Sequence, residues 1–405
     1  SKIIKRSEKI KKNKPNKSII LIANSSWYLF HYRSKLISQI KKSNFYPIAI
    51  APKDKFSDKL SNLCQLVQWK IKSKNSLNIF SLIKPFFYLL SIVYKLKPYI
   101  IHSHTIKANL FVSFVSCFLN YKSVLSFAGL GSLSNKNGLQ KIIFVYILKT
   151  IYIFSTIEKK GFFSWLRNYE RTIFIFQNIR DKSFFEELLN LDNKNKQLRL
   201  ISGSGVPNIY VQSPTSVFIR EKKININNLC FVYCARLLRS KGIVDFLELS
   251  KIYKQYKFYV YGEIDLNSKD SITKSEYLNY KNNLSNVFFQ EFKSNPLLNH
   301  QNDQPVLIVP SCYGEGFPRA IAEAICLGFP VIASENACAS HFNRNQVFMT
   351  KNCDAESLKK QVMKIKKFIK NDQLRELLID SKKFIEDNYT EELIVSKTLE
   401  IYEEI

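Results

Sequence analysis

The chain has 405 residues, of which 46% are hydrophobic, so it can build two domains with real cores and is not a disordered protein. Its 61 Lys and Arg against 33 Asp and Glu give a formal charge of +28, which favours polyanionic partners such as nucleic acid, anionic lipid or phosphorylated small molecules. Because no uncharged apolar stretch of about 18 residues occurs, we expect no membrane-spanning helix.

Two further features bear on the cellular setting. Residues 1–17 are basic but are followed by no apolar segment of the signal-peptide kind, so we expect a disordered tail. The tail can be solvated or can contact anionic lipid, and the sequence favours neither alternative. The eight cysteines lie mostly in apolar runs and include no CxxC pair, which predicts reduced, structural thiols in a cytoplasmic protein rather than a zinc site.

Strands and helices are predicted to alternate along the first half of the chain. The predicted strands are 18–24, 47–51, 99–102, 123–127, 172–177 and 198–201, and the helices between them include 28–42, 106–119 and 139–152. Such alternation is typical of a parallel sheet with helices on both faces. We therefore predict a first α/β domain at residues 18–206.

The pattern restarts after a segment rich in proline and asparagine, 207–228, which we interpret as an interdomain linker. The predicted strands are 229–235, 256–261, 287–289, 306–310 and 330–333, and the helices are 244–254, 318–327, 355–370 and 372–387. This predicts a second domain at 229–385 and a C-terminal helix at 386–405 that packs back on the first domain. Since ligands bind beyond the carboxyl ends of parallel strands, we expect the site in a cleft between the two sheets.

The segment GEGFPRAIAEAICLGFPVIAS begins at residue 314, just after the predicted strand 306–310. Two glycines flank Glu315 and let backbone approach a ligand, and Pro318 suits the first turn of a helix whose free N–H groups can bind an anion. Carboxylates such as Glu315 and Glu323 accept hydrogen bonds from hydroxyls. Together these groups suit a sugar nucleotide, although a solvated Glu315 and a surface ion pair between Glu323 and Arg319 are the simpler alternatives.

The strings EGFPRAIAEA and LGFPVIAS resemble the signature of the family 4 retaining glycosyltransferases. The resemblance implies the GT-B fold, in which two Rossmann-like, doubly wound parallel-sheet domains face a central cleft. It also implies roles for the residues of this segment. Glu315 and the backbone of Gly316, Phe317 and Pro318 would face the donor sugar, and Glu323 would bind the ribose hydroxyls.

Other motifs extend the resemblance to residues 18–385. CARLLRSKG, at 234–242, matches the family's R-x-x-x-x-K-G element, which implies that Arg236 and Lys241 bind the donor diphosphate; ordinary surface cations are the alternative. The strings ANSSWYLFHYRSKLI, VLSFAGLGSLS, IFIFQN and LISGSGV resemble one subgroup, which extends lipid-linked oligosaccharides or surface polysaccharides. In the first of these strings, Arg33 would face the cleft.

The chain departs from the family at one histidine. Many members carry a His after the strand that corresponds to 123–127, where this chain has Phe-Ala-Gly. We therefore consider His104, in IHSHTIK, as a candidate catalytic residue together with Lys107. The alternative, that these residues end a strand and have no catalytic role, is equally supported. No Asp-x-Asp motif occurs, so we expect neither metal nor cofactor, with Arg236, Lys241 and the helix terminus stabilising the diphosphate.

The resemblance implies a retaining glycosyltransferase that moves a sugar from UDP-hexose or UDP-N-acetylhexosamine to a lipid-linked or surface-polysaccharide acceptor, as in capsule or lipopolysaccharide biosynthesis. Aromatic helices in the first half fit a cytoplasmic enzyme peripheral to the inner face of the cell membrane, although most of these aromatics can equally be core. The lysines at 72, 74, 84, 95 and 97 form a candidate basic rim for anionic lipid.

Two other functions remain as alternatives. A sugar-nucleotide epimerase on the same scaffold would turn over the nucleotide sugar without an acceptor. A polyanion-binding or nucleic-acid-binding protein would explain the charge, but no helix-turn-helix, zinc-finger or RNA-binding signature occurs. We therefore expect no nucleic-acid partner.

Overall fold

The structure is a computed structural model, and the chain forms two compact units in it. It describes residues 17–71, 79–119, 121–130, 138–156, 172–192, 195–266, 268–291 and 295–405. The first unit comprises the amino-terminal half up to Ser204, apart from a short segment that starts at Gly129, together with Ile394–Ile405. The second unit comprises Gly205–Leu393 with Gly129 and Leu130.

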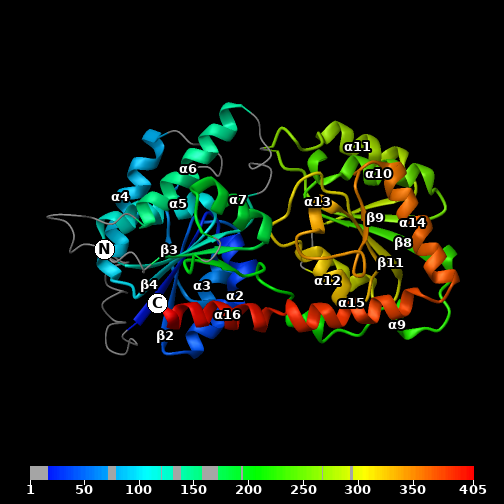
Figure 1. The fold of residues 1–405 in the computed structure, drawn as a ribbon. Coiled ribbons are helices and arrows are strands. Elements are labelled where there is room, and N and C mark those ends of the chain that lie inside the picture. Colours follow the sequence, from blue (N-terminus) through cyan, green and yellow to red (C-terminus); the bar gives the residue numbers. More distant parts are fainter. Residues whose placement is uncertain are drawn as a thin grey trace. The chain divides into compact units, whose positions relative to one another are not determined.

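The first unit is built on a parallel sheet of seven strands in the order β3-β2-β1-β4-β5-β6-β7 (Figure 1). The strands are β1 Lys17–Ala23, β2 Phe45–Ala51, β3 Gln65–Gln68, β4 Ile100–His104, β5 Lys122–Phe127, β6 Thr172–Phe176 and β7 Leu198–Leu200. Helices cover both faces, which explains why apolar runs such as Ile19–Ala23 are buried on both sides. These helices are α2 Ser26–Lys42, α3 Ser57–Leu63, α4 Ile79–Leu96, α5 Ile106–Phe118, α6 Leu139–Thr156 and α7 Ile179–Leu189.

The last helix, α16 Glu391–Glu404, contributes to the core of the first unit from Ile394 onward. Its apolar residues Ile394, Val395 and Ile401 pack in the same cluster as strands β1 and β4. The hydroxyl of Tyr402 forms a hydrogen bond with Nδ1 of His102 on β4. The carboxyl-terminal residues are thus tied to the centre of the seven-stranded sheet.

The second unit is built on a parallel sheet of six strands in the order β10-β9-β8-β11-β12-β13 (Figure 1). The strands are β8 Leu229–Cys234, β9 Lys257–Tyr261, β10 Val287–Gln290, β11 Gln304–Val309, β12 Val331–Ser334 and β13 Phe348–Thr350. Its helices of eight residues or more are α10 Ile243–Ile252, α11 Lys274–Asn283, α12 Arg319–Leu327, α14 Ala355–Lys370 and α15 Leu374–Asn388. The shorter ones are α8 Asn208–Val211, α9 Val217–Arg220, η4 Ile226–Asn228, η5 Arg239–Lys241, η6 Pro296–His300 and α13 Glu335–Cys338.

The segment interpreted as a linker, 207–228, contains α8, α9 and η4 and lies within the second unit. Its apolar side chains Tyr210, Val217 and Phe218 are buried, which anchors it to the six-stranded domain. Strands β3 and β13, of four and three residues, were not predicted. Helix α2 begins two residues before the predicted start, since the Ser25 side chain accepts a hydrogen bond from the N–H of Tyr28 and so caps it.

Helix α6 is long and apolar enough to cross a membrane by length and composition, whereas we expected no such helix because Lys141 and Lys149 interrupt the run. In the structure α6 packs along α5 within the first unit. One stripe of α6 is buried and includes Phe144, Leu148 and Ile151. Only 28% of the helix is buried, however, and large apolar side chains such as Ile142, Ile143 and Tyr146 remain exposed.

The strand order reverses once in each sheet, between β1 and β4 in the first unit and between β8 and β11 in the second. At such a switch point the connections leave in opposite directions, and a crevice opens beyond the carboxyl ends of the two strands. The loops after β1, β4, β8 and β11 are therefore the places where this fold positions ligand-binding side chains.

Candidate active site

The switch point of the second unit holds an ion pair between Lys241 and Glu315. Lys241 ends η5 after strand β8, and Glu315 lies in the loop between β11 and α12. The two loops meet because Gly242, with φ of 76°, has no side chain: a Cβ there would lie 2.3 Å from the carbonyl oxygen of Pro310. The glycine of the K-G element is thus a packing requirement.

The Lys241–Glu315 pair is largely removed from water, with side-chain exposures of 13% and 22%. Burial lowers the pKa of Lys241, but the Glu315 carboxylate and the nearby Tyr313 outweigh burial, so the net effect raises that pKa. The Lys241 ammonium also lies 4.4 Å from the centre of the Tyr313 ring. The site therefore keeps a full positive charge in a poorly hydrated position, where it can stabilise a developing anion.

The backbone after Glu315 is fixed by a histidine that lies outside all of the sequence motifs. Nε2 of His341 lies 2.7 Å from the carbonyl oxygen of Gly316, and its ring stands edge-on to Phe317 at 5.2 Å. Burial lowers the pKa of His341, so the ring is neutral and donates its Nε2–H to that carbonyl. In a planar trans peptide the N–H of Phe317 then points away from His341.

Glu323 lies inside α12, where its side chain accepts a hydrogen bond from Nε of Arg319 at 2.6 Å. The residue is only 9% exposed, so this i,i+4 pair is not the solvated surface pair that was the simpler alternative. Burial raises the pKa of Glu323, although Arg319 and the Tyr210 hydroxyl oppose that effect. The carboxylate is thus held at a cost in stability, which is common for groups that serve a ligand.

Arg236 follows strand β8 and forms an ion pair with Asp265 at 2.9 Å, with 61% of its side chain exposed. Its neighbour Arg239 pairs with Glu276. Neither partner was anticipated, because a pair between distant loops leaves no spacing signal in the sequence. Because an exposed ion pair is weak, the Arg236 guanidinium can turn to a ligand phosphate at small cost.

His104 lies at the end of β4 in the first unit and is fully buried. Nε of Arg33 donates to its Nδ1 at 3.3 Å, and burial lowers the pKa of His104 well below its usual value. The ring is therefore neutral, with its proton on Nε2. In this tautomer His104 can donate a hydrogen bond, but it cannot act as a base through Nε2.

Two family models match this chain over most of its length. Residues 216–383 match the group 1 glycosyl transferases, and residues 18–157 match the glycosyl transferase 4-like proteins. The chain is a glycosyltransferase, matching the 4-like proteins in its first half and the group 1 proteins in its second. The predicted family and enzyme class are thereby confirmed.

The glycosyltransferase is 26% identical over 316 residues to an N,N'-diacetylbacillosaminyl-diphospho-undecaprenol alpha-1,3-N-acetylgalactosaminyltransferase of Campylobacter jejuni, covering 76% of this chain and 77% of the relative. Among solved structures, HepE of Anabaena bound to UDP-glucose superposes with a TM-score of 0.72 at 13% identity, over 96% of this chain and all of that one. Sucrose-phosphate synthase of Thermosynechococcus elongatus superposes with a TM-score of 0.72 at 16% identity, over 96% of this chain and 99% of that one. These likenesses confirm the predicted GT-B fold.

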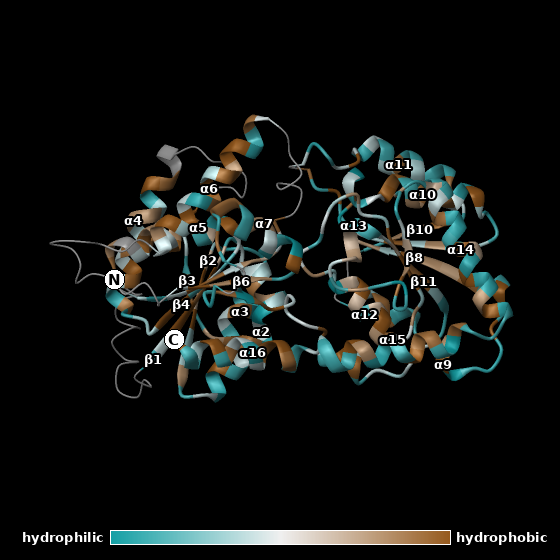
Figure 2. Ribbon diagram, viewed as in Figure 1, coloured by the Kyte–Doolittle hydropathy of each residue, from teal (hydrophilic) through white to brown (hydrophobic). Residues whose placement is uncertain are grey.

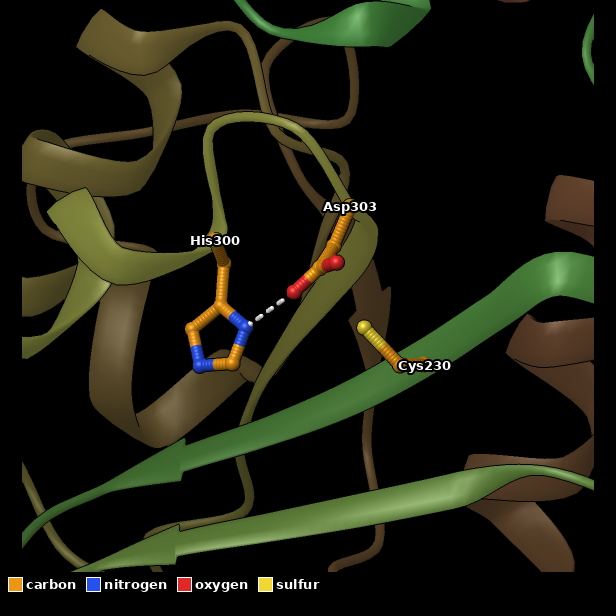
Figure 3. Close-up of side chains that lie close together, drawn as sticks. All are labelled: Cys230, His300 and Asp303. Atoms are coloured by element: carbon orange, nitrogen blue, oxygen red, sulfur yellow. Dashed lines mark hydrogen bonds and ion pairs between the residues drawn. The ribbon is translucent and has the colours of Figure 1, made fainter.

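The described part of the glycosyltransferase contains one cluster of possible metal ligands, Cys230, His300 and Asp303 (Figure 3). Nδ1 of His300 faces the Asp303 carboxylate at 2.8 Å, while its Nε2 lies 2.9 Å from the hydroxyl of Tyr261. Burial raises the pKa of the Cys230 thiol to about 12. Because both ring nitrogens are engaged and the thiol is protonated, we interpret this cluster as structural; it also lies at the amino ends of β8 and β11, away from the switch point.

Proposed function

We propose that this glycosyltransferase moves a sugar from UDP-hexose or UDP-N-acetylhexosamine to a lipid-linked saccharide, with retention of anomeric configuration. The observation that carries the proposal is the Lys241–Glu315 pair at the switch point of the second sheet, a cation for a diphosphate beside a carboxylate for a sugar. The names of the similar proteins support the substrate classes: one acts on a diphospho-undecaprenol, and another was solved with UDP-glucose.

The leaving UDP is stabilised electrostatically in this proposal. Its diphosphate would compete with Glu315 for Lys241, so the carboxylate becomes available to orient the sugar hydroxyls. Arg236 and the N–H of Phe317 provide further donors, while Glu323 binds the ribose. These groups do the work that a divalent ion does in other transferases, and we propose that the reaction needs neither metal nor cofactor.

Retention then follows from attack on the face that the diphosphate leaves. The bond between the anomeric carbon and the diphosphate oxygen breaks, and its electron pair departs with UDP. The acceptor hydroxyl oxygen bonds to the anomeric carbon on that same face, and its proton passes to the leaving diphosphate oxygen. No protein base is required, in agreement with a neutral, hydrogen-bond-donating His104.

We further propose that the first unit works at the inner surface of the cell membrane. Large apolar side chains are exposed along helices α4 and α6 and at the end of α5, which Figure 2 shows as hydrophobic ribbon. They are Ile83, Phe87, Tyr94, Phe118, Leu139, Ile142, Ile143, Tyr146 and Ile153. Lys84, Lys95 and Lys97 of the expected rim are exposed on or beside α4, whereas Lys72 and Lys74 lie outside the described residues. This surface fits a lipid-linked acceptor and anionic headgroups.

A transfer assay tests the proposal. Purified enzyme is incubated with a panel of UDP-sugars and a polyprenyl-diphosphate-linked saccharide, and the product is analysed by mass and by NMR of the new anomeric centre. We expect transfer with retention, in the presence of a chelator. Lys241→Met should lower kcat by about a hundredfold, as for loss of one charge-stabilising donor.

Lys251→Met is the matched control, because Lys251 also pairs with a glutamate, Glu248, but on the exposed surface of α10. In a parallel thermal-shift series, UDP should raise the Tm of the wild type and of the control. It should raise the Tm of Glu323→Gln much less. Inverted product, or epimerised UDP-sugar without an acceptor, would overturn the proposal.

A further inference from the structure

The first unit has a cavity of about 250 Å³ at its own switch point. Loops after three neighbouring strands form its walls: Asn24 and Ser25 follow β1, Pro52–Asp54 follow β2, and Lys107 follows β4. The volume has room for roughly eight waters at about 30 Å³ each, which suits a small polar group. It is below the usual size of a site for a whole nucleotide sugar.

The cavity is positively charged. Lys53 and Lys107 both line it, and Asp54 is the one acidic residue among the described residues of its wall. The Asp54 carboxylate accepts hydrogen bonds from the backbone N–H groups of Trp27 at 2.8 Å and Phe56 at 2.9 Å. One oxygen of Asp54 thus holds its loop against the start of α2, and the other accepts a hydrogen bond within the loop, while Lys53 and Lys107 bring two positive charges to the wall.

Lys107 is a half-buried cation on the cavity wall. It lies in the first turn of α5, at the positive end of the helix dipole, and that turn contains no acidic residue. Burial lowers its pKa. The N-cap before it, Thr105, has a φ of 107°, which is strained for a β-branched residue, and its buried hydroxyl finds no partner among the described residues.

A second, independent observation lies beside the cavity. His104 is fully buried, and its Nε2 has no hydrogen-bond partner within the described part of the chain. His104 is the last residue of β4 and pairs with Ala23, the last residue of β1, and the loops after both strands form part of the cavity wall. Its other nitrogen is held by Arg33, a 7% exposed guanidinium that forms none of the ion pairs found between described residues. A buried cation without a carboxylate raises the positive potential of this edge.

We propose that this cavity, the phosphate pocket formed by Asn24, Ser25, Lys53 and Lys107, binds the diphosphate group that joins the acceptor saccharide to its lipid. The inference rests on the proposed function, because that function supplies an acceptor with a diphosphate. Two ammonium groups and short polar side chains recognise phosphoryl oxygens well. The pocket would thus fix the acceptor by its anionic linkage and leave the saccharide to reach the donor.

The test compares lysines of the same loop region. Lys107→Met and Lys53→Met remove the pocket charges, and Lys107→Arg retains one. Lys55→Met is the matched control, because Lys55 lies in the loop of Lys53 but stacks on Phe56, 5.6 Å from the ring centre, and does not line the pocket. The assay measures the KM for the diphosphate-linked acceptor, and inhibition by inorganic pyrophosphate, with the UDP-sugar at saturation.

We expect Lys107→Met to raise the acceptor KM by about tenfold to a hundredfold, as for a lost hydrogen bond between charged groups, and to weaken pyrophosphate inhibition in parallel. Lys55→Met should match the wild type, and Lys107→Arg should restore most of the affinity. An unchanged acceptor KM in both methionine variants would overturn the inference. The inference would also be overturned if the methionine variants lost binding to anionic vesicles but kept wild-type inhibition by pyrophosphate. That result would show that the lysines contact lipid headgroups.

Failure of the inference is distinguishable from failure of the proposed function. If UDP still stabilises the wild type and sugar is transferred, but the pocket variants behave like Lys55→Met, the function stands and the phosphate pocket is wrong. If UDP neither binds nor is released from any UDP-sugar, the proposed function fails first. Pyrophosphate binding to wild type that Lys107→Met abolishes would then still support an anion pocket.

Discussion

At the scale of single residues, the contact between His341 and Gly316 carries a specific prediction. His341 is a positioning residue, because its Nε2–H fixes the peptide that presents the N–H of Phe317. We expect His341→Phe, which keeps the ring but loses the donor, to lower kcat roughly fivefold, as for one neutral hydrogen bond of about 1 kcal/mol. His341→Gln should recover part of the loss because its amide can donate. Steady-state kinetics with the UDP-sugar and acceptor varied in turn provide the measurement.

The control for His341 is His31→Gln, at a half-exposed position of α2 whose Nδ1 contacts the Trp27 carbonyl. A purely structural role for His341 would lower the Tm of the ligand-free protein and leave kcat of the folded fraction unchanged. The positioning role requires the opposite: kcat falls while the acceptor KM stays constant. If His341→Phe has wild-type kcat, the Gly316 peptide does not depend on this hydrogen bond.

The residues of the site differ in how far the sequence could reveal them. Lys241 and Glu315 lie in motifs with fixed spacing and follow predicted strands, so their meeting at one sheet edge could be expected. His341 and Asp265 carry no such signal, because each reaches its partner through tertiary packing alone. For His104 the sequence indicated the position, while its tautomer and burial depend on Arg33, which lies 71 residues earlier.

At the scale of elements, helices α4 and α6 present exposed apolar stripes that the sequence could only partly assign. Apolar residues every three or four positions predict a buried face, and α6 has such a face at Phe144 and Leu148. The opposite stripe, with Ile142 and Tyr146, is equally apolar but remains 52% and 66% exposed. Composition alone cannot separate the two stripes. Which stripe is buried depends on the neighbouring helix, because α5 packs on one side of α6.

The exposed stripe of α6 predicts membrane binding that mutation can remove. The double variant Ile142→Asn and Tyr146→Asn should weaken co-sedimentation with anionic vesicles by about tenfold or more, since each apolar side chain buried in the interface contributes about 1.5 kcal/mol or more. Leu278→Asn is the matched control, because Leu278 is 54% exposed on the polar helix α11 of the second unit. Equal sedimentation of both variants and wild type would show that this stripe does not contact lipid.

At the scale of the whole molecule, two buried histidines and one half-buried histidine make stability depend on pH. Burial lowers the pKa of His102 and His104 in the first unit and of His341 in the second. In the unfolded chain each titrates near the ordinary value of about 6.5, so the unfolded state binds these protons first. The stability that these neutral histidines contribute is therefore fully present above about pH 6.5, and it is lost progressively as the pH falls below that value. Glu323 acts with the opposite sign, because its raised pKa lets the folded state take up a proton first.

We accordingly expect the Tm to be constant from pH 8 to 7 and to fall below about pH 6.5, with a slope of up to about 1.4 kcal/mol per pH unit for each histidine that stays neutral when folded. His102→Gln should have a lower Tm at pH 7.5, because it loses contacts with Tyr402 and Ser126, but a shallower slope. The two curves should therefore converge near pH 5.5. Parallel curves would mean that His102 becomes protonated in the folded protein. The Tyr402–His102 tie would then survive acid, and the loss of stability would have to come from groups outside this buried cluster.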